Sequence, residues 1–275
     1  VLYQSTANGT VLRIGNMGTS NNSHEGTLHN RVRDLTIDRS VAQGGSSIGL
    51  FVERAKYTDV DGIYVYNSAY GIAVGPNCSC VNVIPNQFTN ISDSILEVQG
   101  SIKGGDTGFS EAAVIFWSGA DHKMNEVFIE PTNRGIVMDN WSNGIQLVQV
   151  SVINGSAFNY GVISKGSGFA RIITNSLFEN ALHGQIYIAE SSHRVVVANS
   201  WIGAGDTAGT TRVGIQIDPG ASQVIINGNR IGDQRLQGLI SRGDNVQVIG
   251  NQFTGNVNTG STSHDSVQFE GGQHI

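Results

Sequence analysis

The sequence predicts an all-β solenoid, a single stack of about ten equivalent coils. Three observations support this fold class. An apolar residue recurs about every 25 residues along the chain, and a second apolar residue stands five positions before each of these. Segments rich in Val, Ile, Thr, Tyr and Phe are interrupted by Gly, Asn and Ser, as in strands and turns. The helix-favouring residues Leu, Lys and Glu are few by comparison.

One strand of each predicted coil is marked by the recurring apolar position, which we call the anchor. The anchors are Ile37, Val65, Phe88, Ile129, Val152, Phe178, Ile202, Ile231 and Phe253. The residues five positions earlier are Val32, Val60, Val83, Met124, Leu147, Ile173, Val197, Ile226 and Val248. Residues 81–89 match residues 246–254 at seven of nine positions, which supports Phe88 as an anchor. The step from Phe88 to Ile129 is 41 residues long and predicts an inserted polar loop around residues 100–109, well placed to line a groove.

A second strand in each coil has the form Gly-apolar-x-apolar, as in residues 49–52, 71–74 and 135–138. Side chains alternate between the faces of a strand, so the third residue of each motif is expected to point outward. These outward positions are Phe51, Ala73, Ile115, Val137, Ile163, Tyr187, Gln216, Ile240 and Gln268. Because such an apolar stripe needs a cover, we expect a parallel homotrimer with a threefold axis. The alternative cover is a loop or a further segment folded over the stripe.

Composition and charge limit the other possibilities. The continuous register favours one elongated domain over residues 1–275. A net charge of −6 without a Lys/Arg cluster argues against a nucleic-acid partner, and no apolar run approaches the roughly 20 residues of a membrane helix. Cys78 and Cys80 are the only cysteines, so we expect no disulfide framework, no metal site and no cofactor. The chain starts at Val1 and stops at Ile275 within the pattern, so we expect a fragment of a longer protein.

The segment Asn30–Asp38 reads Asn-Arg-Val-Arg-Asp-Leu-Thr-Ile-Asp and is followed by the Gly-apolar-x-apolar strands and Asn-rich turns. In these features the chain resembles, over roughly residues 25–275, the right-handed parallel β-helix of the pectin-lyase-like superfamily. More narrowly, it resembles bacteriophage tailspike and tail-fibre depolymerases. The resemblance implies a trimeric protein of the virion tail, outside the cell, that recognises and usually cleaves a bacterial surface polysaccharide such as capsule or O-antigen.

The resemblance does not identify catalytic residues. The Asn-Thr-Asp, Asp-Asp and Gly-His-Gly segments of the superfamily's polygalacturonases are absent, and so is the Asp cluster of its calcium-dependent pectate lyases. Tailspike enzymes share no catalytic motif that can be transferred by alignment. Catalytic candidates therefore have to come from the register of this sequence.

Hydrolysis of a glycosidic bond requires a carboxylic acid and a carboxylate on one face. The position after the anchor holds Glu130 and Glu179, two coils apart and therefore separated by roughly 9 to 10 Å. This distance is near the upper end of the roughly 6.5 to 9.5 Å spacing of inverting enzymes. The sequence thus predicts Glu130 and Glu179 as the catalytic pair of an inverting endo-glycosidase, with Asp139 as a further candidate. Three acids with fewer aromatic or acidic companions at matching register rank lower: Glu97, Glu126 and Asp218.

The position before the anchor holds a partly aromatic row of Tyr64, Phe128, Leu177, Trp201 and Arg230. Aromatic rings pack against the C–H faces of sugars, so Tyr64, Phe128 and Trp201 are the candidates for substrate binding. The alternative is that these rings are buried under the turn loops. Asp106 and Glu111 of the predicted insert are further candidates for substrate contact or catalysis.

Two other functions stay open at this point. A polysaccharide lyase would need a base and a charge neutraliser, and the basic residues available for this are His122, Lys123, Arg171, His193 and Arg194. A non-catalytic receptor-binding module would use the β-helix only as a rigid support. A fold alone does not decide between these functions.

Overall fold

The chain folds into a stack of parallel β-strands, described here from a computed structural model. The structure describes residues 2–3, 10–15, 27–38, 48–53, 55–66, 68, 70–75, 87–92, 94–98, 112–131, 133–153, 158–203, 213–255 and 266–271. Within these ranges every regular element is a β-strand, and the strands pair in parallel from coil to coil. The predicted all-β parallel β-helix is therefore confirmed.

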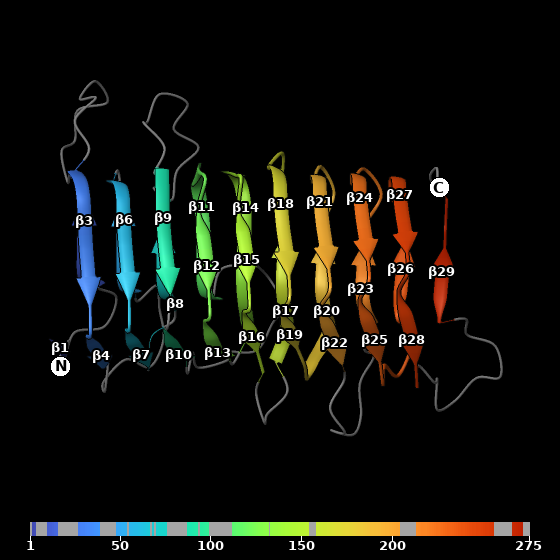
Figure 1. Cartoon of the computed structure of the whole chain (residues 1–275), viewed down its shortest axis with the longest axis horizontal. Coiled ribbons are helices and arrows are strands. Elements are labelled where there is room, and N and C mark those ends of the chain that lie inside the picture. The colour runs from blue at the N-terminus through green and yellow to red at the C-terminus, as the bar shows by residue number, and fades with distance from the viewer. Residues whose placement is uncertain are drawn as a thin grey trace.

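Three walls of strands enclose one interior, and Figure 1 shows the strands following one another along the long axis of the molecule. Wall A consists of β1 (Leu2–Tyr3), β4 (Thr36–Asp38), β7 (Tyr64–Tyr66), β10 (Ile95–Val98), β13 (Phe128–Pro131), β16 (Ser151–Val152), β19 (Leu177–Phe178), β22 (Trp201–Gly203), β25 (Arg230–Gly232) and β28 (Gln252–Thr254). Wall B consists of β2 (Thr10–Gly15), β5 (Ile48–Glu53), β8 (Tyr70–Val74), β11 (Ala112–Ala120), β14 (Arg134–Asn143), β17 (Phe158–Ser164), β20 (Ala181–Ile188), β23 (Val213–Ile217), β26 (Leu239–Ser241) and β29 (Val267–Phe269). Wall C consists of β3 (Thr27–Arg33), β6 (Ala55–Asp61), β9 (Gln87–Ser92), β12 (Lys123–Asn125), β15 (Gln146–Val148), β18 (Phe169–Thr174), β21 (His193–Ala198), β24 (Ser222–Asn227) and β27 (Asp244–Ile249). The chain passes through walls B, C and A in turn.

The predicted anchor register is present in most of the stack. In wall A the Cα partners run from Ile129 through Val152, Phe178, Ile202 and Ile231 to Phe253. In wall C the residues five positions earlier also pair with one another, from Met124 through Leu147, Ile173, Val197 and Ile226 to Val248. The side chains of Ile129 and Ile231 are fully buried in the main core. Burial of these apolar columns is the main stabilising contribution to the stack.

The assignment of Phe88 as an anchor is wrong. Phe88 lies in β9 of wall C, and β9 pairs with β6 and β12. Leu96 of β10 takes the anchor place between Val65 and Ile129, and Ile91 stands five residues before it. The local match of residues 81–89 to residues 246–254 therefore selected the wrong frame, because the second apolar pair lies only a few residues further along the chain.

In most of the described coils, two corners are formed by single residues in the left-handed conformation. Between walls B and C the corner residues include His29, Tyr57 and Asp121, with φ values of 55°, 52° and 59°. Between walls C and A they include Asn175 and Asn199, with φ values of 52° and 50°. A single positive φ redirects the chain without a loop, so successive coils keep the same length and the strands stay in register.

The glycine of the Gly-apolar-x-apolar motif is required by close packing between coils. A Cβ atom at Gly49 would lie 2.6 Å from Cγ1 of Val65 and 2.8 Å from the carbonyl oxygen of Gly71 in the next coil. Both distances are shorter than van der Waals contact allows, so a side chain at this position would push the two coils apart. The motif read from the sequence is therefore a packing requirement of wall B.

Arg171 is a charged residue inside the stack. Its side chain is fully buried, and its guanidinium donates hydrogen bonds to the carbonyl oxygens of Asp139 (2.8 Å), Lys165 (3.0 Å) and Ser142 (3.2 Å) and to the hydroxyl of Ser164 (2.7 Å). Burial lowers its pKa to about 10, so it is still charged at neutral pH. Arg171 thus satisfies carbonyl groups of two successive coils at the turn from wall B to wall C.

The outward stripe predicted on wall B is present in the expected register. Its Cα partners run from Phe51 through Ala73, Ile115, Val137, Ile163, Tyr187, Gln216 and Ile240 to Gln268. Four consecutive members, Ala73 to Ile163, are at most 1% exposed in the single chain. Trp117, Tyr160 and Tyr187 pack against this second apolar cluster. At these four positions no second copy is needed as a cover, and the homotrimer stays a prediction.

Candidate functional site

Wall A carries a row of acidic residues one position after the anchors. The pairing of β10 with β13 makes Glu97 and Glu130 direct Cα partners. The pairings of β13 with β16 and of β16 with β19 continue this row through Ile153 to Glu179. Glu130 and Glu179 are both half-buried. The sequence did not reveal the alignment of Glu97 with Glu130, because the anchor assigned at Phe88 was wrong.

The predicted aromatic row lies on the same wall, one position before the anchors. Tyr64 and Phe128 are linked through Ile95 of the coil between them, and Leu177 pairs with Trp201 further along the row. The rings of Tyr64, Phe128 and Trp201 are all half-buried. The positions before and after an anchor point to the same side of the strand, so the acidic and aromatic rows share the outer face of wall A.

A hydrogen bond joins the two rows. The indole Nε1–H of Trp201 donates to Oε1 of Glu179 at 2.9 Å. On the other side of Trp201, the guanidinium carbon of Arg230 lies 4.4 Å from the centroid of the indole ring. The cation–π contact with Arg230 fixes the indole ring of Trp201, and the hydrogen bond from this ring fixes the orientation of the Glu179 carboxylate.

The spacing of the acids fits carboxylate chemistry on glycosidic bonds. Strands of a sheet lie about 4.8 Å apart, so Glu97 and Glu130 are one spacing apart, and Glu130 and Glu179 are about 9.6 Å apart along the row. Retaining glycosidases hold their carboxyl groups roughly 5 to 5.5 Å apart and inverting ones roughly 6.5 to 9.5 Å. By strand register, the spacing of Glu97 and Glu130 is near that of a retaining enzyme, and the spacing of Glu130 and Glu179 is near that of an inverting enzyme.

The other predicted acids lie elsewhere. Asp139 belongs to β14 of wall B, and its carboxylate forms an ion pair with Lys165 at 3.1 Å. It therefore does not join the row of Glu130 and Glu179. Asp106 and Glu111 lie outside the described residues, as do most of the predicted insert and both cysteines.

Two of the basic residues considered for a lyase are buried. His122 is 1% exposed and Arg171 is fully buried. Burial lowers the pKa of His122 to about 4, opposed in part by the backbone of Ser118. His193 is half-buried with Nδ1 2.7 Å from the hydroxyl of Ser222, and the exposed Arg194 donates to Gln223 at 3.1 Å. Lys123 lies on the surface, in the groove described next.

Wall C carries a groove that the sequence reasoning missed. It has a volume of about 600 Å³ and crosses β3, β6, β9 and β12 near the N-terminal end of the stack. The rings of His29 and Tyr57 stack at its edge, with centroids 5.0 Å apart and planes 11° from parallel. Charged groups in the groove are Arg31, Asp59, Asp121 and Lys123. These residues are exposed and do not repeat from coil to coil, so a search for apolar periodicity could not find them.

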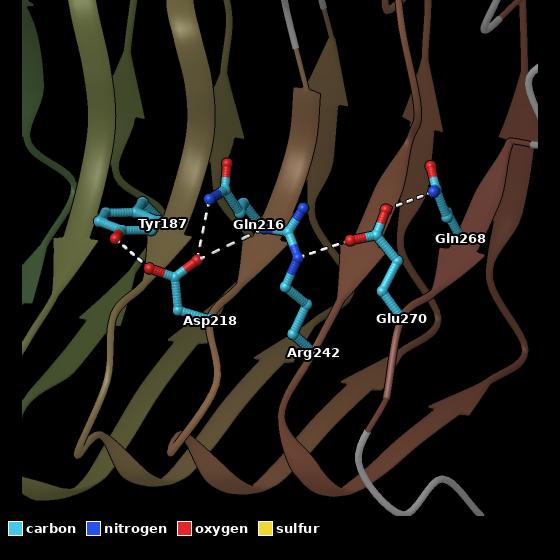
Figure 2. A network of polar contacts seen from close by, with 6 residues as sticks. All are labelled: Tyr187, Gln216, Asp218, Arg242, Gln268 and Glu270. Atoms are coloured by element: carbon cyan, nitrogen blue, oxygen red, sulfur yellow. Dashed lines mark hydrogen bonds and ion pairs between the residues drawn. The ribbon is translucent and has the colours of Figure 1, made fainter.

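The C-terminal half of the wall B stripe is polar and forms a network that extends along several coils (Figure 2). Asp218 accepts hydrogen bonds from the hydroxyl of Tyr187 and from Nε2 of Gln216, the latter at 2.9 Å. Arg242 lies 4.0 Å from Asp218 and 2.6 Å from Glu270. Burial and the bond to Asp218 raise the pKa of Tyr187. Every charged member is bound to a residue on an adjacent coil, so we interpret this network as a support of the stack.

Among the described residues, no three His, Cys, Asp or Glu side chains gather in a way that would hold a metal ion. The same part of the chain contains no helix with the length and hydropathy required to span a membrane.

Comparison with known proteins gives relatives in fold only. No protein-family model matches the chain, and no curated protein matches it either. Among solved structures, the surface protein and adhesin PfbA of Streptococcus pneumoniae is similar, with a TM-score of 0.58 and 10% identity over 98% of this chain and 83% of that chain. The A-module of the mannuronan C-5 epimerase AlgE6 of Azotobacter vinelandii gives a TM-score of 0.50 and 13% identity over 90% of this chain and 74% of that one.

A tailspike protein of the Escherichia coli bacteriophage HK620, solved as a double mutant, also has a TM-score of 0.50, with 11% identity. The match covers 89% of this chain but only 60% of the tailspike chain. At these identities the likeness concerns the β-helix scaffold alone. The scaffold is thus shared with adhesins, an epimerase and tailspikes.

Proposed function

We propose that this chain is an endo-acting glycoside hydrolase that cleaves a bacterial surface polysaccharide, with the polymer lying along wall A. The observation that carries the proposal is the common row of Glu130 and Glu179 beside an aromatic row on the same face. Two carboxyl groups on one face are the minimum for hydrolysis of a glycosidic bond, and flat rings beside them suit the C–H faces of sugars.

The surroundings of the two acids suggest their roles. Glu179 accepts the Trp201 N–H, and this bond fixes the orientation of the carboxyl group, which suits a group that must activate a water molecule. Glu130 is the other carboxyl group of the pair, and an inverting mechanism requires one acid to protonate the leaving oxygen. We therefore assign Glu179 as the general base and Glu130 as the general acid of an inverting mechanism.

We further propose that the protein acts outside the cell, as a tailspike or a comparable surface protein, and as a homotrimer. The tailspike and the surface adhesin that share the fold support such a location. The register of paired strands along the described stack suits a rod exposed to its target.

The test is incubation of the protein with a panel of capsule and O-antigen polysaccharides, followed by sizing and mass analysis of the products. We expect one polymer to be shortened to oligosaccharides. Glu130→Gln and Glu179→Gln should each lower the rate by at least about 100-fold while the fold is kept, because general acid–base groups contribute about 10² to 10⁴ in rate. Glu190→Gln, an exposed acid at a turn on the wall B side, is the matched control with an unchanged rate.

Two other outcomes would favour the alternatives. Products with a new ultraviolet absorbance would indicate an unsaturated sugar and hence a polysaccharide lyase. Tight binding of a polymer without any decrease in its size would indicate a non-catalytic receptor-binding module. Either result would refute hydrolysis by Glu130 and Glu179.

A further inference from the structure

The groove on wall C has an aromatic edge in a costly backbone conformation. His29 and Tyr57 occupy the corner between walls B and C with φ values of 55° and 52°. Bulky residues are rare at positive φ. At the same corner other described coils have Asp121, Gly144, Ala170, Arg194, Gln223 or Asn245, so His29 and Tyr57 are the aromatic residues among these positions. Tyr57 is nevertheless 46% exposed. An aromatic pair that is neither buried nor suited to its backbone is better explained by binding than by stability.

Among the described residues, neither Arg31 nor Lys123 of the groove forms an ion pair. Arg31 and Asp59 are Cα partners on adjacent strands, but among the described residues they form no ion pair. Arg33 and Asp61 are Cα partners at the next outward-pointing position of the same two strands. These two residues do form an ion pair, with a distance of 3.1 Å. The difference shows that the strand geometry permits such a pair. The guanidinium of Arg31 is therefore available to a ligand.

A second cation lies at the other end of the groove. Arg31, Asp59, Asn90 and Lys123 follow one another in a single row across β3, β6, β9 and β12. Three strand spacings separate Arg31 from Lys123, about 14 Å. A single small anion cannot reach both cations, whereas successive units of an acidic chain can.

We propose that this groove binds an acidic oligosaccharide, a segment of a polymer that contains hexuronic acid. One sugar unit packs on the exposed surface of the His29 and Tyr57 pair, and its carboxylate binds Arg31. A later unit places its carboxylate at Lys123. Asp59 lies between the two cations in this row and accepts hydrogen bonds from the hydroxyl groups of the sugar.

The site is distinct from the acidic row of wall A and does not depend on hydrolysis there.

Calorimetric titration with tetramers of galacturonic, glucuronic and mannuronic acid tests the proposal. The matched probe is each tetramer with its carboxyl groups reduced to alcohols. We expect at least one acidic tetramer to bind, at least about tenfold more tightly than its reduced form, because charge-assisted hydrogen bonds are lost on reduction. Absence of binding by all three, or equal binding of the reduced forms, would overturn the proposal.

Variants separate this site from a general effect of charge. Arg31→Ala should weaken binding at least about tenfold, whereas Arg33→Ala, which removes an equal charge one outward position away, should leave it unchanged. Tyr57→Asn should weaken binding and raise the unfolding temperature, since Asn tolerates positive φ. If Tyr57 had only a structural role, Tyr57→Asn would lower the unfolding temperature and leave binding unchanged. Glu130→Gln should bind as the wild type does, so failure of the hydrolase proposal leaves this test intact.

Discussion

Acid should destabilise the protein through His122, whose imidazole is buried in its neutral form. The ring stacks on Phe116 with centroids 5.5 Å apart, and its Nδ1 accepts the backbone N–H of Thr89 at 3.3 Å. A proton added to Nδ1 would point at that N–H and remove the acceptor. Burial accordingly lowers the pKa of His122 from 6.5 to about 4.

The sign and size of the effect follow from proton linkage. The pKa is about 4 in the folded state and 6.5 in the unfolded state, so the unfolded state binds the proton first as the pH falls. The contribution of His122 is complete above pH 6.5 and is lost between about pH 6.5 and 4. Between pH 7 and pH 4.5 the free energy of unfolding should fall by about 2 kcal/mol through this group, at about 1.4 kcal/mol per pKa unit.

Urea denaturation at pH 7 and pH 4.5 measures this change. Other carboxylates and histidines also titrate in this range, so the informative quantity is the difference between the wild type and His122→Leu. We expect the wild type to lose about 2 kcal/mol more than the variant. Equal pH dependence of the wild type and His122→Leu would refute the reasoning.

Two other substitutions test the packing of the stack. Arg171→Met leaves buried carbonyl groups without their donors and should lower the free energy of unfolding by about 3 kcal/mol in urea denaturation. The surface variant Arg194→Met should change it by less than about 0.5 kcal/mol, and similar losses in both would contradict the role of Arg171. Gly49→Ala places a methyl group 2.8 Å from the carbonyl oxygen of Gly71 in the next coil and should lower the melting temperature with a loss of about 1 to 3 kcal/mol. An unchanged melting temperature would show that the two coils are not in contact.

Much of the fold could be predicted from the sequence because the solenoid repeats its core contacts in every coil. An anchor such as Val152 or Ile202 meets the same neighbours above and below, so periodicity alone reveals it. Phe88 shows the limit of this reasoning. Two apolar residues five apart occur in two frames there, and the choice between them depends on pairing with β7 and β13, which local similarity does not contain.

The candidate sites were less accessible to prediction. Glu130 and Glu179 could be aligned because they flank correctly placed anchors, whereas Glu97 was misaligned together with Phe88. The groove beside Tyr57 was missed because binding residues on a solenoid vary from coil to coil and have no period. The bond from Trp201 to Glu179 depends on side-chain conformation, which a register does not specify.

The residues that cover the wall B stripe could not be predicted from the sequence either. Its apolar character was recognised, but the packing of Trp117 against Phe51, with ring centroids 5.7 Å apart at 87°, comes from a strand that bends between Phe116 and Ser118. Such a bulge redirects side chains locally and leaves no periodic signal. The homotrimer inferred from this stripe can be tested by sedimentation equilibrium.

The stereochemistry of the first product tests the central claim most directly. Proton nuclear magnetic resonance of a freshly cleaved polysaccharide reports whether the new reducing end has the opposite anomeric configuration to the bond that was cut. Glu130 and Glu179 stand two coils apart on wall A, which leaves room for a water molecule, so we expect inversion. Retention would contradict this pair and would point to the closer spacing of Glu97 and Glu130.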